Sequence, residues 1–128
     1  MKHALNALRV ALALGLCLTG NAHADGAHTY QTVCAACHAQ GVAGAPKTGD
    51  KKAWGKLIRE GLVTISADGY GGVRGMPARG GQPDLSLPDF VSAVVHMGNQ
   101  SGATWAEPDD ETLRKIDARL QRRSAKKP

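Results

Sequence analysis

The sequence predicts an all-α domain. Apolar residues recur at the spacing of one helix face in several segments, helix start and stop signals flank those segments, and no segment has a convincing strand pattern. A chain of 128 residues holds one domain at most. We expect helices over residues 27–39, 51–60, 86–98 and 109–123.

Individual residues set the limits of these helices. The first carries its larger side chains on one face, at positions i, i+3, i+4 and i+7: Tyr30, Val33, Cys34 and Cys37. Asp50 is placed to cap the second helix, which Gly61 ends. Ser86 and Asp89 resemble a capping box at the start of the third, which continues to Gly98.

The chain between the second and third helices is harder to assign. Residues 62–67 fit no single pattern. Six of the thirteen residues from Gly69 to Gly81 are glycine, so we expect a loop that lies close against another part of the molecule.

The first 24 residues have the pattern of an export signal. Lys2 and Arg9 provide a basic start, residues 10–18 form a short apolar run, and Ala-His-Ala at 22–24 is a small-x-small cleavage site. The run is too short to span a bilayer as a stable helix, although a retained anchor is the alternative. We therefore expect a periplasmic protein that begins at Asp25.

Loss of this segment changes the composition of the chain. It removes two of the 16 basic residues and none of the 11 acidic ones, which lowers the net charge from +5 to about +3. It also removes Cys17, which fits no lipoprotein signal because Leu16 stands where a small residue is required. The two remaining cysteines lie too close together for a structural disulfide, so the small core calls for a bound cofactor.

Cys34, Cys37 and His38 form the motif C-x-x-C-H, the attachment signature of haem c. Two thiols about one helical turn apart suit addition across the two vinyl groups of one haem, and the next residue then lies under the iron. A thioredoxin-like redox pair would need a βαβ setting, and a zinc site would need a second pair of ligands. The motif predicts one covalent haem with His38 as its proximal ligand.

Four residues are candidates for the sixth iron ligand. Met76 is favoured because it lies in the glycine-rich loop, which can approach a flat group without clashes. Met97 falls on the apolar face of the third helix, where core packing is the simpler role. His96 is typical of a helix-face histidine, and His28 of a surface residue near a helix start.

On these residues the sequence resembles the class I c-type cytochromes, most closely their cytochrome c5-like bacterial branch. The similarity spans residues 27–98. It rests on the attachment motif with the run to Lys47, on Trp54, on Gly-Met-Pro-x-x-Gly-Gly at 75–81, and on Asp-Leu-Ser at 84–86 opening a helix that ends in Met97.

The resemblance implies a small helical domain, residues 25–105, wrapped around one haem. It implies His38 and Met76 as axial ligands and the Pro46 carbonyl as acceptor of a hydrogen bond from the proximal imidazole. Trp54 would pack along the haem edge near a propionate, or serve as plain core. Three features depart from the family: no cysteine remains for a disulfide near the methionine loop, residues 62–73 lack the usual clear apolar helix, and His96 replaces an aromatic residue.

With both axial positions filled, the resemblance implies a one-electron carrier and not an enzyme. Basic residues could surround the haem edge and steer an acidic redox partner: Lys47, Lys51, Lys52, Lys56, Arg74 and Arg79. The alternatives are a dedicated subunit of one periplasmic oxidoreductase or terminal oxidase, and a ligand-sensing haem protein. We expect a monomer and, for lack of any recognition motif, no nucleic-acid partner.

Residues 106–128 lie outside the resemblance. Leu113, Ile116 and Leu120 share one face of the predicted last helix, and its acidic start and basic end complement the helix dipole. Since the gain from burying three side chains is similar to the cost of ordering the segment, we expect weak docking. The basic end is expected to contact an acidic partner or an anionic membrane surface, away from the haem pocket.

Overall fold

The computed structural model describes residues 24–127, and these confirm the all-α class. Within them the β pairing is limited to one isolated bridge, between Val73 and Met76. The predicted export signal lies outside the described residues, apart from Ala24. The elements in chain order are α1 (Gly26–Thr29), η1 (Tyr30–Cys34), α2 (Ala35–His38), η2 (Val42–Gly44), α3 (Lys51–Glu60), α4 (Leu62–Tyr70), η3 (Ala78–Gly81), α5 (Leu87–Gln100) and α6 (Asp110–Ala125).

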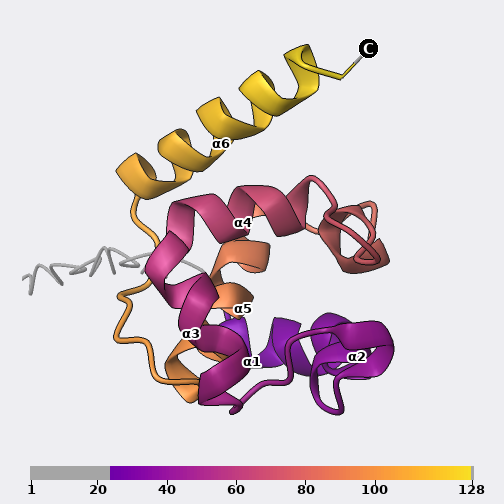
Figure 1. The fold of residues 1–128 in the computed structure, drawn as a ribbon. Coiled ribbons are helices and arrows are strands. Elements are labelled where there is room, and N and C mark those ends of the chain that lie inside the picture. Colours follow the sequence, from indigo (N-terminus) through magenta and orange to yellow (C-terminus); the bar gives the residue numbers. More distant parts are fainter. Residues whose placement is uncertain (1–23, 128) are drawn as a thin grey trace, which may run out of the picture.

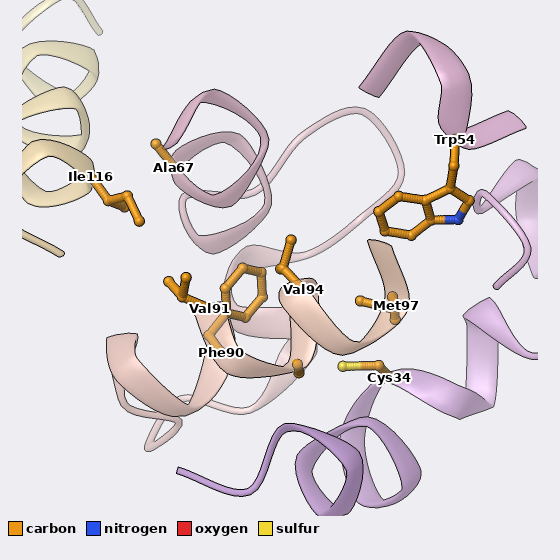
Figure 2. Packing of buried hydrophobic residues seen from close by; sticks show 9 residues of the cluster. Cys34, Trp54, Ala67, Phe90, Val91, Val94, Met97 and Ile116 are labelled. Carbon is orange, nitrogen blue, oxygen red and sulfur yellow. The ribbon is translucent and has the colours of Figure 1, made fainter. Parts of the chain in front are cut away.

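Helix α4 lies in the middle of the molecule (Figure 1). It packs against α5 on one side and against α6 on the other, and α1 packs against α5. Figure 2 shows the core that results, in which Phe90, Val91 and Val94 of α5 form one cluster with Ala67 of α4 and Ile116 of α6. The extra C-terminal helix therefore contributes to the same core as the rest of the domain.

The predicted first helix is continuous but contains one wide turn. Asp25 caps α1 by accepting a hydrogen bond from the His28 amide at 3.0 Å. The π-helical turn η1 follows and ends at Cys34, so α2 begins inside the attachment motif. Single π-helical turns within α-helices are frequent at functional sites, and this one includes Cys34, the first residue of the attachment motif.

Residues 62–67, which the sequence left unassigned, form the first two turns of α4. Asp50 caps α3 through the amides of Lys52 and Ala53, and Gly61, with φ of 88°, turns the chain from α3 directly into α4. The helix also continues to Tyr70, two residues into the predicted loop. Because α5 and α6 cover opposite sides of α4, its sequence has no polar face to reveal helical periodicity.

The crossing of α1 and α5 depends on Gly26. A Cβ atom at this position would lie 2.2 Å from the Ser92 carbonyl oxygen, which is backbone and cannot rotate away. Gly26→Ala is therefore expected to separate the helices and to destabilise the fold by about 1–3 kcal/mol. Thermal unfolding of the holoprotein measures the effect, which corresponds to a fall in Tm of roughly 5–20 °C.

Gly55→Ala in α3 is the matched control. A Cβ atom there meets only the mobile end of Arg59, at 3.6 Å. Alanine also favours the helix, so the stability should rise by about 0.5–1 kcal/mol. Equal Tm changes for the two variants would contradict the proposed close crossing.

Helix α6 docks on α4 through its apolar face. Ile116 is completely buried, and Leu113 and Leu120 pack against the same core. Hydrogen bonds from Thr112 lower the pKa of Asp109, the residue that caps the helix. At the basic end of the helix Arg123 turns inward and donates a hydrogen bond to the Ala67 carbonyl of α4. None of the helices in residues 24–127 is both long and apolar enough to cross a membrane.

Candidate haem-binding site

A cavity of about 360 Å³ lies among α2, α3, α4, α5 and the loop that follows α4. Apolar side chains form much of its wall, among them Val33, Leu57, Ile65, Phe90 and Val94. All six site residues predicted from the sequence line this one cavity: Cys34, Cys37, His38, Pro46, Trp54 and Met76. In Figure 1 α2 and the loop after α4 lie on the same side of the molecule, where this cavity is found.

His38 is buried and held in one orientation. Its Nδ1 lies 2.9 Å from the Pro46 carbonyl oxygen. A carbonyl can only accept a hydrogen bond, so Nδ1 carries the proton and donates it, which leaves Nε2 with a free lone pair. A neutral imidazole fixed in this way is prepared to bind a metal ion.

The two cysteines of the motif differ in exposure. Cys34 is buried and Cys37 is exposed, and they are not joined by a disulfide. Burial raises the pKa of the Cys34 thiol to about 11. Redox-active C-x-x-C pairs instead contain a thiol whose pKa is lowered, so the environment of Cys34 does not suit a thioredoxin-like function.

Trp54 lines the cavity, and only 3% of its surface is exposed. Figure 2 shows its ring on α3, on the same side of the core as Met97. Its indole Nε1–H has no hydrogen-bond partner among residues 24–127. A buried donor without an acceptor is costly. The site therefore suits a bound group that is largely apolar and brings an acceptor oxygen to this position.

The structure separates the four candidates for the sixth ligand. Met76 and Met97 both line the cavity, whereas His28 and His96 do not. The ring of His96 instead packs against Tyr30, with the two centroids 5.3 Å apart. Met97 is 4% exposed and belongs to the hydrophobic core, while Met76 is only partly buried and lies in a loop.

Comparison with known proteins gives the family. The family described as "Cytochrome C oxidase, cbb3-type, subunit III" matches residues 21–97. Cytochrome c-555 of Chlorobaculum tepidum is 44% identical over an alignment of 94 residues, and the match covers 67% of this chain and 87% of that protein. This protein is a class I c-type cytochrome. It is also 39% identical to cytochrome c5 of Ectopseudomonas mendocina over 66 residues, 50% of this chain and 76% of that protein.

A solved structure supports the same family. A chain from the "Crystal structure of electron transfer complex of nitrite reductase with cytochrome c" matches with a TM-score of 0.57 and 37% identity. The match covers 59% of the present cytochrome and 93% of that chain. As a member of this family of small electron carriers, the cytochrome carries covalently attached haem c. The unpartnered Trp54 donor and the oriented His38 fit that cofactor, whose propionates supply acceptor oxygens.

The charges around the cavity of this cytochrome are mixed. Of the predicted basic residues, Lys56 and Arg74 line the cavity, but so do the acidic residues Glu60 and Asp68. Arg79 does not extend freely into solvent: its guanidinium lies 4.9 Å from the centre of the Tyr70 ring and donates to the Pro83 carbonyl. The remaining predicted members, Lys47, Lys51 and Lys52, are exposed.

Two residues beside the site were not found by sequence reasoning. Asp68 lines the cavity and forms an ion pair with Arg123, at a distance of 3.2 Å. Asp68 lies in the stretch without a clear pattern, and Arg123 belongs to the tail outside the family resemblance. Only their contact in the folded chain connects them with the cavity.

Proposed function

We propose that this cytochrome is a periplasmic one-electron carrier that holds a single haem by thioethers to Cys34 and Cys37, with His38 and Met76 as axial ligands. The observation that carries the proposal is the gathering of these residues in one cavity with the His38 ring oriented by Pro46. When bound, the haem supplies the chemistry, which is the change of its iron between the ferrous and ferric states.

The residues of the chain account for the properties of a carrier. His38 and Met76 together would fill both axial positions, so no site remains for a substrate and catalysis is not expected. The apolar wall excludes water and disfavours the more highly charged ferric form, and a methionine ligand acts in the same direction on the potential. Both effects raise the reduction potential relative to a solvent-exposed bis-histidine haem.

The periplasmic location is supported by the export signal in the sequence, and an acidic partner by the charges near the cavity. Lys56 lines the cavity, and its side chain is largely exposed. Three further exposed lysines lie close to it in sequence: Lys47, Lys51 and Lys52. The structural relative was solved in an electron-transfer complex with nitrite reductase, which favours a redox enzyme as partner. Arg122 on α6, and Lys126 and Lys127 directly after it, remain exposed for a weaker contact with such a partner or with an anionic membrane surface.

A dedicated subunit is the second candidate. It is favoured by the matching family, whose description names subunit III of a cbb3-type oxidase. Purification under mild conditions distinguishes the two functions, because a subunit remains with one oxidase through successive columns whereas a shuttle separates from it.

Electron transfer to an acidic redox protein tests the proposed function. We expect the rate from the ferrous cytochrome to fall steeply as salt is added, since the charges that steer the encounter are exposed. Lys56→Glu should lower the rate at low salt by roughly tenfold. Arg59→Glu, the same charge change on the same helix but outside the cavity lining, should lower it much less. A rate that is independent of salt and unchanged in Lys56→Glu would contradict the proposal that an acidic partner binds beside Lys56.

A further inference from the structure

Arg123, near the end of α6, contacts the C-terminal end of α4. Its Nη1 donates to the Ala67 carbonyl at 2.7 Å, and its Nη2 donates to the Gly72 carbonyl at 3.0 Å. Nη1 also lies 3.2 Å from Oδ1 of Asp68. One planar guanidinium thus binds two backbone carbonyls and a carboxylate around the last turn of α4.

The Gly72 carbonyl begins the segment that carries Met76. The Val73 amide donates to the Met76 carbonyl at 3.1 Å, and the Met76 amide donates to the Val73 carbonyl at 2.9 Å. Between them, Arg74 has a φ of 50°, a left-handed conformation that is strained for a residue with a side chain. A tight, strained turn persists only where its surroundings support it, and Arg123 bonds the carbonyl of Gly72, the residue directly before this turn.

We propose that Arg123 is a positioning residue for Met76, and that α6 thereby stabilises the sixth iron ligand without lining the cavity. The inference rests on the proposed His38–Met76 ligation. The ion pair with Asp68 alone would contribute little, because both side chains are about one-third exposed. The two bonds to backbone carbonyls instead hold residues 72–76, which carry Met76, in a fixed position relative to α6.

Arg123→Ala in the holoprotein tests the proposal. Imidazole competes with Met76 for the ferric iron. If the equilibrium constant for methionine ligation falls by some factor, the apparent affinity for imidazole rises by that factor. We expect a rise of about fivefold, given that the lost bonds are charge-assisted but partly exposed to solvent. Hydrogen exchange at the amides of Val73 and Met76 should accelerate. Arg122→Ala, which removes an exposed arginine one position earlier, is the control and should change neither quantity.

One further variant separates positioning from charge and from loss of the helix. Arg123→Lys keeps the charge and the apolar stem, but an ammonium group cannot bond both carbonyls in the fork geometry. Its imidazole affinity should lie between those of Arg123→Ala and the wild type, with the circular dichroism of the native protein retained.

The outcomes distinguish this proposal from the one on which it rests. Imidazole affinity in Arg123→Ala or Arg123→Lys that equals the wild-type value would overturn the positioning role. A wild-type protein without a methionine–iron charge-transfer band would instead overturn the proposed ligation by Met76.

Discussion

Met76→Ala is expected to lose the methionine–iron charge-transfer band of the ferric protein and to bind carbon monoxide in the ferrous state. Removing the proposed ligand opens the iron, so the reduction potential should fall as a weaker, more polar ligand replaces the methionine sulfur. The expected spectral change is complete, because of the four predicted candidates Met76 and Met97 line the same cavity as the oriented His38, and Met97 belongs to the core. Absorption spectra before and after carbon monoxide addition provide the measurement.

Met97→Ala is the control for this experiment. Met97 is buried in α5, and truncation of a core methionine typically costs about 2–5 kcal/mol, so this variant should melt earlier and yet keep its band. Loss of Met76 also removes packing, which means that melting temperatures cannot distinguish the two roles. A Met76→Ala protein that retains the band, with a Met97→Ala protein that loses it, would assign the ligand to α5.

Replacing both motif cysteines should convert a haem that resists extraction into one that is removed completely. The wild-type protein should retain its colour in acid–acetone, because thioether bonds are covalent and survive unfolding. The variant Cys34→Ala with Cys37→Ala should release any haem that it binds. Either single variant should keep its haem through the remaining thioether, so the two cysteines can be assessed separately.

Intact mass of the wild-type protein from the periplasm tests the same prediction together with the predicted cleavage. The mass should equal residues 25–128 with one haem added. A chain that still includes residues 1–24 would show a retained anchor, and a mass without haem would contradict the covalent attachment through Cys34 and Cys37.

The sequence was most informative where one short stretch determines the structure. Asp50 and Ser86 each cap the helix that follows, and both caps were visible from the spacing of polar and apolar residues. The attachment motif is equally local, since three residues within five positions specify it. Features of this kind need no knowledge of distant parts of the chain.

The features that could not be predicted depend on contacts between distant segments. Helix α4 was unassigned because it is covered by α5 and by α6, and a helix covered on two sides has no polar stripe. Basic residues in the last turn of α6 interact favourably with the helix dipole, and this local effect is sufficient to explain the exposed Arg122. Only the folded structure shows that Arg123 has a different role, because its acceptors lie more than fifty residues earlier.

This long separation has a consequence for the order in which the chain matures. The contact between Arg123 and Ala67 joins residues 56 positions apart, and closing such a loop is slow compared with forming the helices themselves. The chain is synthesised from its N-terminus, so the attachment motif is made well before the residues of α6. Docking of α6 therefore belongs to the last stage of folding. It follows the synthesis of the attachment motif, which is accessible for haem attachment before α6 docks.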